Sequence, residues 1–392
     1  MSIRSQIGSV VHKEIFTTYQ RVYDKERPWV ITSYITLPYY FRWFRPYMLA
    51  HQNREGSLII REAFRDLGFN FLAVSSKKEN VREYIDSSKV KIVFGIEPNF
   101  VNFSKLYPKV TKVYFATGAY YKHQNDMIIK RTNEVNRKKH CSLQYSRLVS
   151  EHESVKIADW IIQIGSKYTL ETYPEEVHQK IRIVRQNTFE FLRYDEKIKT
   201  KNFDPRTFLW FGSTGAVLKG LDLVLDFFAK NNQYTLHVVG PVEKDFQQVY
   251  ENELFHTQNI YFHGPLNINS RQLLKIAGEA SFVVLPSASE GGCPGSVLNM
   301  MRLGMVPIVS KYAAFDSIEN FGFVTNDLSV EGLSKAIDEA SKMTRQELLR
   351  AFAVNSEFVT SNFNSLTFLN DLKESFQQFL GSKFCKKAKE MQ

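Results

Sequence analysis

Cysteine is scarce in this sequence. The 392 residues contain three cysteines, at positions 141, 293 and 385, and no Cys-x-x-Cys pair. This odd, sparse set argues against a disulfide framework or a structural zinc site and is typical of a protein in a reducing cytoplasm. The stretch 1–16 lacks the continuous apolar core of a secretory signal, and no apolar run approaches the roughly 20 residues of a membrane-spanning helix. We therefore expect a cytoplasmic protein that is not integral to a membrane.

Several familiar catalytic motifs are also missing. No Gly-x-Gly-x-x-Gly follows an expected strand and no P-loop occurs, which disfavours nicotinamide and flavin enzymes and P-loop NTPases. The absence of Gly-x-Ser-x-Gly weighs against an α/β-hydrolase. Neither Asp-x-Asp nor His-Glu-x-x-His is present, so no carboxylate pair that would hold a divalent cation on a nucleotide diphosphate is visible. We expect neither a metal nor another cofactor.

Positive charge is unevenly distributed. Residues 1–200 carry 33 Lys and Arg against 21 Asp and Glu, a balance of +12, whereas residues 201–392 carry 18 against 20, a balance of −2. A basic half can bind nucleic acid, an anionic membrane surface or an acidic small molecule, and a merely solvated basic surface is an equal alternative. Because no RNA- or DNA-binding motif occurs, nucleic acid is not expected as a partner.

Short apolar runs alternate with longer amphipathic stretches along the whole chain, which is typical of parallel-sheet α/β domains. The expected strands are 29–35, 69–74, 91–96, 112–116 and 160–164 in the first half and 207–211, 235–239, 260–263, 281–285, 306–309 and 321–324 in the second. The expected helices are 57–67, 219–230, 294–303 and 366–380.

A charged stretch at 187–206, which ends in Asp-Pro, is interpreted as an interdomain linker. We therefore predict an α/β protein with two Rossmann-like, doubly wound domains that face each other across a cleft, at about 1–200 and 201–365. The segment 366–392 is predicted to be a helix that packs back toward the first domain, followed by a basic tail.

Two turns in the second half combine small residues with one charged side chain each. After the expected strand 207–211, Gly212 and Gly215 let backbone amides approach a ligand, and Lys219 stands where it can neutralise a diphosphate. After the strand 281–285, Glu290 repels phosphate but can accept hydrogen bonds from sugar hydroxyls. The alternatives are a solvated lysine and a glutamate that caps the next helix. Together the turns match a ligand with an anionic and a polyhydroxyl part.

The order and spacing of the motifs in this half resemble the donor domain of GT-B glycosyltransferases, of the retaining family 4 type (glycosyl transferases group 1). The similarity covers about 205–345 and extends weakly into the first half at 33–35, 51–55 and 117–123. The motifs are Phe211-Gly-Ser…Lys219-Gly-Leu, His237-Val-Val-Gly240, Tyr261-Phe-His-Gly264 and Pro286…Ser289-Glu-Gly…Pro-Gly-Ser-Val-Leu…Met301…Gly304…Pro307-Ile-Val-Ser310.

The resemblance implies that Gly212, Ser213 and Lys219 contact the donor diphosphate. Many members of the family have an arginine where this chain has Ser213, so one positive charge is supplied elsewhere or is dispensed with.

The resemblance also implies that Glu290 holds the transferred sugar, with backbone amides of Gly291, Gly292 and the neighbouring Ser296 around it. The second glutamate of the family's Glu-x7-Glu motif, which grips the ribose diol, is absent, and Asn299 is its expected replacement. An amide binds a diol less strongly than a carboxylate does.

In the first half, the family places a histidine after the fourth strand, facing the anomeric carbon of the donor. His123, expected in the loop after 112–116, is the candidate, and a surface histidine is the alternative. His51 and Arg54 are weaker candidates for the acceptor side.

A dense basic run and the aromatic, arginine-rich stretch 39–47 suit the headgroup layer of an anionic membrane, where lipid-linked glycans lie. The alternative is that these aromatic side chains belong to the core and that the charges are solvated. The basic run comprises Lys130, Arg131, Arg137, Lys138 and Lys139.

The expected activity is therefore transfer of a hexose-type sugar from a nucleotide-diphosphate sugar to a glycan or lipid-linked acceptor, with retention of configuration and without a metal. Such a reaction belongs to cell-surface polysaccharide or glycoconjugate assembly, on the inner face of the cytoplasmic membrane. Two alternatives stay open: a sugar-nucleotide 2-epimerase of the same architecture, and an inactive partner subunit of a glycosyltransferase.

Overall fold

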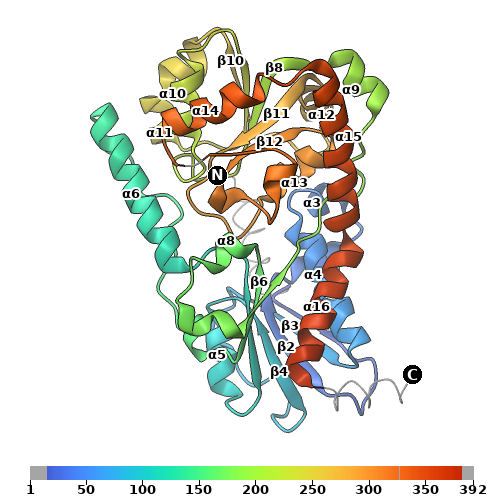
Figure 1. Cartoon of the computed structure of the whole chain (residues 1–392). Coiled ribbons are helices and arrows are strands. Elements are labelled where there is room, and N and C mark those ends of the chain that lie inside the picture. The colour runs from blue at the N-terminus through green and yellow to red at the C-terminus, as the bar shows by residue number, and fades with distance from the viewer. Residues whose placement is uncertain (1–15, 326, 382–392) are drawn as a thin grey trace, which may run out of the picture.

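The computed structural model describes residues 16–325 and 327–381 and contains two parallel-sheet α/β domains, one above the other (Figure 1). The first sheet has seven strands in the order β1-β3-β2-β4-β5-β6-β7, and the second has six in the order β10-β9-β8-β11-β12-β13. All pairs are parallel except β1 with β3. The predicted class, two doubly wound α/β domains, is confirmed.

The first sheet contains all five strands that the apolar runs predict. Its strands are β1 (Thr18–Arg21), β2 (Trp29–Tyr34), β3 (Asn70–Ser75), β4 (Val90–Gly95), β5 (Thr111–Ala116), β6 (Trp160–Ile164) and β7 (Ile181–Val184). The two edge strands, β1 and β7, were not predicted. Each has four residues and is partly exposed, so its sequence lacks the continuous apolar run of a buried parallel strand.

Helices cover both faces of the first sheet. They are α2 (Leu37–Phe41), α3 (Arg45–Met48), α4 (Asn53–Asp66), α5 (Asn99–Leu106), α6 (Tyr121–Lys139), α7 (Ser154–Ile157), α8 (Lys167–Leu170) and a 3₁₀ turn, η1 (Glu175–Lys180). Helix α4 begins four residues before the predicted start at 57. Its buried Phe64 packs against Phe94 of β4 with ring centroids 5.5 Å apart.

The second domain matches its predicted elements closely. Its strands are β8 (Asp204–Phe211), β9 (Thr235–Val239), β10 (Ile260–Gly264), β11 (Ala280–Leu285), β12 (Val306–Ser310) and β13 (Phe323–Thr325). Its helices are α10 (Leu221–Phe228), α11 (Lys244–Val249), α12 (Arg271–Glu279), α13 (Gly295–Arg302), α14 (Val330–Ala340) and α15 (Arg345–Asn362), with short helical turns η2 (Asn252–His256), η3 (Lys311–Ala313) and η4 (Ile318–Asn320). The central strand β11 is buried throughout and pairs with β8 and β12.

Helix α16 (Ser365–Leu380) returns from the second domain to the first along one side of the molecule (Figure 1). Phe376 packs on Phe64 with ring centroids 4.6 Å apart, and Phe368, Leu372 and Phe376 belong to the first domain's core. Arg185 and Asp371 add an ion pair of 2.7 Å. The basic tail predicted after this helix, at 382–392, lies outside the described residues.

Helix α6 is the longest of the helices that the sequence analysis did not predict. It has 19 residues and extends from the first domain along the second (Figure 1). Val135 belongs to the second domain's hydrophobic core, and Ile128 packs with Leu218 and Ala288 of that domain. Charged and polar side chains make up most of this helix, so the apolar periodicity that indicates a helix is weak in its sequence.

The basic run of α6 is largely engaged inside the molecule. Arg131 Nη2 lies 2.6 Å from Asp222 Oδ2 in α10, and both side chains are buried. Lys138 lies 2.7 Å from Asp226, and Lys139 bridges Asp226 and Glu253 at 3.2 and 2.7 Å. Lys130 and Arg137 are exposed. The prediction that this run is a free surface for acceptor or membrane is therefore wrong for Arg131 and Lys139, because acidic groups of the second domain bind them away from solvent, whereas Lys138 pairs with Asp226 and stays 54% exposed.

The segment 187–206, predicted as a linker, contains helix α9 (Glu196–Asn202) and the first residues of β8. Lys199 explains the packing of this charged helix. Its side chain is 2% exposed, and its ammonium donates to the carbonyl of Ala277 at 2.7 Å and to that of Ala280. It also lies 4.7 Å from the centre of the Phe352 ring. A charged residue thus anchors α9 to the end of α12.

The burial of Lys199 predicts a pH-dependent stability. Burial lowers the pKa of Lys199 to about 7, against about 10.4 in an unfolded chain. Between these values the unfolded chain binds more protons, so this group's cost to folding is full below pH 7 and fades as the pH rises. Lys199→Met should raise Tm by about 2–5 °C at pH 6.5, and by less at pH 9.5. Calorimetry at both pH values tests this, with the exposed Lys230→Met as control; an equal difference at both would contradict it.

Candidate functional site

The two charged turns lie side by side because their strands are neighbours. Strands β8 and β11 pair in parallel at the centre of the second sheet, so the turns that follow them leave the same edge. This edge, at the carboxyl ends of the strands, is where open parallel sheets bind ligands.

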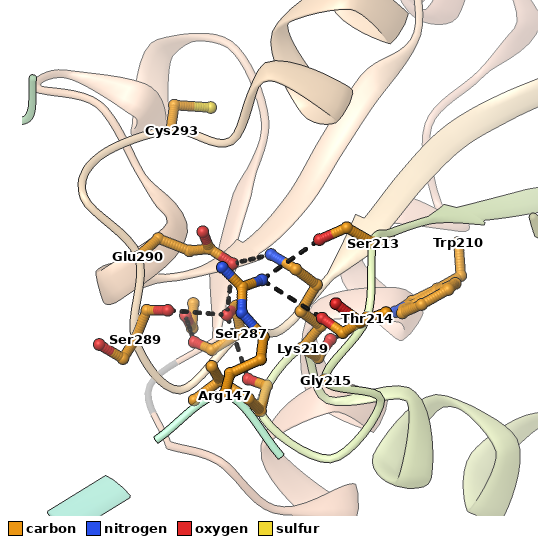
Figure 2. A network of polar contacts seen from close by, with 12 residues as sticks. Arg147, Trp210, Ser213, Thr214, Gly215, Lys219, Ser287, Ser289, Glu290 and Cys293 are labelled. Carbon is orange, nitrogen blue, oxygen red and sulfur yellow. Dashed lines mark hydrogen bonds and ion pairs between the residues drawn. The ribbon is translucent and has the colours of Figure 1, made fainter. Parts of the chain in front are cut away.

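Lys219 and Glu290 form an ion pair (Figure 2). The Lys219 ammonium donates to Glu290 Oε1, and Ser287 Oγ donates to the same oxygen at 2.8 Å. The two side chains are 6% and 14% exposed. Buried charges of this kind require a partner, and here each is the other's partner. The indole of Trp210 donates to the Lys219 carbonyl at 3.2 Å, which fixes the backbone below the ammonium.

The glycines of the first turn serve packing. A Cβ on Gly212 would lie 2.3 Å from the Trp210 ring, and one on Gly220 would lie 2.4 Å from the Pro286 carbonyl at a φ of +69°. The amides of Gly215 and Ala216 donate to the carboxylate of Glu243. Glu243 therefore occupies two backbone amides of the turn between β8 and α10.

Arg147 reaches this turn from the segment that follows α6. Its Nη1 donates to Ser213 Oγ and to the Thr214 carbonyl, both at 3.2 Å (Figure 2). Sequence reasoning missed Arg147, because its place depends on where α6 directs the chain. The signal in the sequence was indirect: Ser213 stands where the resemblance calls for a cation.

The second turn is in contact with the backbone of the first domain. A Cβ on Gly291 would lie 2.6 Å from the Thr117 carbonyl, and one on Gly292 would lie 2.7 Å from the Gly165 Cα. The Gly291 carbonyl accepts from Thr169 Oγ1 at 3.0 Å. These glycines permit the close approach of the two domains next to Glu290.

Of the two polar residues predicted in α13, Asn299 is buried and Ser296 is partly exposed. Asn299 is 2% exposed, and its side chain accepts from the Phe189 amide at 2.9 Å and donates to Gln52 and to the Gly295 carbonyl at 3.1 and 2.7 Å. Ser296 lies in the first turn of α13 and is partly exposed. A role of Asn299 at the ribose stays a prediction, and it requires these bonds to be exchanged.

His123 lies in the first turn of α6, so its predicted location in a loop is wrong. Its ring packs on Tyr312 with centroids 4.7 Å apart, and its Nε2 is buried without a hydrogen-bond partner among the described residues. Burial lowers the pKa of His123, with Asp126 opposing and Lys311 adding to the shift. A neutral imidazole with an unused nitrogen thus faces the second domain. Its position against the donor stays a prediction.

His51 and Arg54 lie at the start of α4. Burial and the nearby Arg54 lower the pKa of His51, and the charge of Arg147 contributes to the shift. The guanidinium of Arg54 stacks on the Tyr47 ring, 3.8 Å from its centre.

A cavity of about 210 Å³ opens in the first domain at the ends of β4 and β5. Glu97 lines it, with Oε2 buried and without a hydrogen-bond partner in the described chain. His152 Nε2 lies 3.9 Å from Glu97 Oε1, and burial lowers the pKa of His152. Thr117 and Arg147 also line the cavity, so it adjoins both turns. A glutamate directly after an apolar strand was the sequence signal for this group.

Comparison with known proteins identifies the second domain. Residues 205–342 match the family model described as Glycosyl transferases group 1. The second domain is a group 1 glycosyl transferase domain. None of the curated proteins matches the chain significantly.

Solved structures show the same fold over about nine tenths of the chain. Sucrose-phosphate synthase from Thermosynechococcus elongatus is similar with a TM-score of 0.60 and 12% identity, over 91% of this chain and 99% of that one. HepE from Anabaena, in complex with UDP and glucose, is similar with a TM-score of 0.55 and 13% identity, over 90% of this chain and 100% of HepE. A glycosyltransferase from Rickettsia africae has a TM-score of 0.53 and 10% identity, over 91% of this chain and 99% of that one. The GT-B fold is thereby confirmed, and the fold with its glycosyl transferase domain supports a glycosyltransferase.

Two further features of the described residues concern metals and membranes. Within residues 16–325 and 327–381, no three His, Cys, Asp or Glu side chains gather as a metal-ligand cluster. In the same part of the chain, none of the helices is long and apolar enough to cross a membrane.

The contact at Gly291 predicts that activity needs close approach of the two domains. In Gly291→Ala the new methyl group meets the Thr117 carbonyl and separates the domains, so sugar transfer should fall at least about tenfold while the circular dichroism spectrum is unchanged. Gly278→Ala is the matched control, because its Cβ would meet one atom at an ordinary 3.9 Å. Full activity of Gly291→Ala would show that this contact is dispensable.

Proposed function

We propose that this glycosyltransferase moves a hexose-type sugar from a nucleotide-diphosphate sugar to a glycan or lipid-linked acceptor, with retention of configuration. The pairing of Lys219 with Glu290 in a group 1 glycosyl transferase domain carries the proposal. The two groups match the two halves of such a donor, because an ammonium binds phosphate and a carboxylate accepts hydrogen bonds from sugar hydroxyls.

The donor enters by exchanging one partner for another. The Lys219 ammonium is already largely removed from water, so a diphosphate that replaces Glu290 beside it causes little additional desolvation of the lysine. Glu290 then accepts from the sugar hydroxyls. As the bond to the anomeric carbon breaks, the Lys219 ammonium stabilises the charge that develops on the leaving diphosphate. A reaction without a metal ion is part of the proposal.

The first domain supplies the other side of the reaction. His123 presents its free nitrogen to the sugar, and the neutral imidazole suits a hydrogen bond to a hydroxyl. The cavity beside Thr117 receives the acceptor, where the free oxygen of Glu97 accepts from one of its hydroxyl groups. The fold of HepE, which was solved with UDP and glucose, favours a uridine nucleotide as the donor.

Thermal-shift measurements with UDP-, GDP-, ADP- and CMP-sugars identify the donor. With that donor, Lys219→Ala should lower kcat/KM about a hundredfold, because one charge that stabilises the leaving group is lost. NMR of the product gives the anomeric configuration, which is expected to equal that of the donor.

Matched variants separate chemistry from folding. The double variant Lys219→Ala/Glu290→Gln leaves no buried unpaired charge and should fold yet stay inactive, whereas the exposed Lys230→Ala should keep wild-type activity. Full activity of Lys219→Ala would defeat the proposed function.

A lipid-linked acceptor requires contact with a membrane, and one exposed tip is suited to it. Trp43 and Phe44, between α2 and α3, are 73% and 47% exposed, and the flanking Arg42 and Arg45 are exposed as well. Aromatic and arginine side chains together favour the headgroup layer of an anionic membrane. Tyr39, in contrast, is 7% exposed and belongs to the core. We assign the membrane contact to this tip.

Trp43→Ser/Phe44→Ser should abolish co-sedimentation with vesicles of anionic phospholipid at low salt, because the inserting apolar surface is lost. Leu366→Ser, at a residue 64% exposed on α16, is the control for a general loss of surface apolarity. No enrichment of the wild type on such vesicles would remove the membrane contact from the proposal.

A further inference from the structure

The chain after α6 runs along the second domain. The helix ends at His140 in a left-handed conformation, with φ of +51°, which turns the chain back. Leu143 then packs into the second domain's core. The Gln144 amide donates to Asp245 at 3.0 Å, and Ser146 Oγ donates to Glu243 at 2.9 Å. Several independent contacts therefore hold the segment 140–147 on the domain that contains Lys219.

Arg147 is the last residue of this segment before the chain returns to the first domain. Its φ is +69°, a conformation that a residue other than glycine rarely adopts. Its side chain crosses the turn after β8, and a Cβ on Gly215 would lie 2.7 Å from Arg147 Cδ. Gly215 thus leaves the room that the arginine needs to reach Ser213.

The other groups at this turn that could bind an anion already have a carboxylate as partner. Lys219 is paired with Glu290, and the Gly215 and Ala216 amides are bound by Glu243. Arg147 differs: its guanidinium donates to the neutral oxygens of Ser213 and Thr214, and it forms no ion pair within residues 16–325 and 327–381. An exposed guanidinium with unused donors is a ready partner for a phosphate.

We propose that Arg147 binds a phosphate of the donor diphosphate. A residue from the segment that follows α6 of the first domain would then complete the donor site of the second domain. This inference rests on the proposed function. Arg147 also lines the cavity of the first domain, so a phosphate on the acceptor has the same chemistry. We commit to the donor, because both hydrogen bonds of the Arg147 guanidinium are to the donor-side turn.

The contacts of α6 position this arginine. Arg131–Asp222 and the pairs of Lys138 and Lys139 fix the helix on the second domain, and the segment that leads to Arg147 begins at its end. Asp226, which pairs with both lysines, is a positioning residue in this sense.

Titration calorimetry with UDP, GDP and ADP, without acceptor, tests the inference. For the nucleotide that the wild type binds, Arg147→Ala should weaken the affinity about tenfold, because a charge-assisted contact is lost. Arg147→Lys should restore part of it, and the Kd of Arg147→Ala should depend less steeply on salt than that of the wild type. Arg350→Ala, at an exposed arginine of α15, is the control and should leave the Kd unchanged.

The outcomes separate the inference from the function on which it rests. If Lys219→Ala weakens nucleotide binding and Arg147→Ala does not, Arg147 is not a donor residue and the proposed function stands. If Arg147→Ala instead raises only the KM for the acceptor, its phosphate partner is on the acceptor and the inference is overturned. If the wild type binds none of the three nucleotides, the proposed function fails and the inference with it.

Discussion

Helix α6 meets the second domain at an ion pair that has almost no access to water. Arg131 and Asp222 lie 2.6 Å apart, with side chains 5% and 4% exposed, and burial raises the pKa of Asp222 to about 6 even beside the guanidinium. Removing two charges from water costs several kcal/mol per ion, and their attraction offsets this only in good geometry. The pair therefore adds little net stability. The pair instead fixes the position of α6 along α10, which we call its register, because a shift of α6 would leave both charges buried and unpaired.

That register places His123 and Arg147, the two side chains to which we assign functions. His123 lies at the start of α6, facing Tyr312, and Ile128 packs between Leu218 and Ala288 of the two turns. Arg147 follows the end of the same helix and returns to Ser213. One helix thus brings a neutral imidazole and a guanidinium to a sheet edge that belongs to the other domain. Part of the excess positive charge of the first half thus pairs with acidic side chains of the second domain, at the contact between α6 and that domain.

The charged groups of the site bind one another, and in the proposed function a donor replaces one of these partners. Lys219 and Glu290 satisfy each other, and Glu243 satisfies two amides at the neighbouring turn. Such pairing keeps a charged site stable when it holds no ligand, since an unpaired buried charge would destabilise the domain. Glu97 and His123 are different, because each keeps one buried polar atom without a partner among the described residues. In the proposed function, those atoms bind hydroxyl groups of the sugar and of the acceptor.

The sequence by itself determined the buried parts of this protein. Apolar runs located eleven strands of the two sheets, and the small residues at the ends of β8 and β11 indicated the two turns with Lys219 and Glu290. These signals are local: a buried parallel strand needs a continuous apolar run, and a turn between strand and helix needs small residues. The edge strands β1 and β7 and the helix α6 lack such signals, because each is partly exposed or highly charged.

Only the tertiary structure decided which charges meet. Arg131 and Asp222 are 91 positions apart, and Arg147 and Ser213 are 66 apart. A basic run has the same composition whether it faces solvent, a membrane or an acidic helix, so its sequence does not distinguish these partners. The pairing depends on where packing places α6 against α10. That placement is set by apolar contacts and buried charges distributed over both domains, and it converts an apparent surface patch into the support of the site.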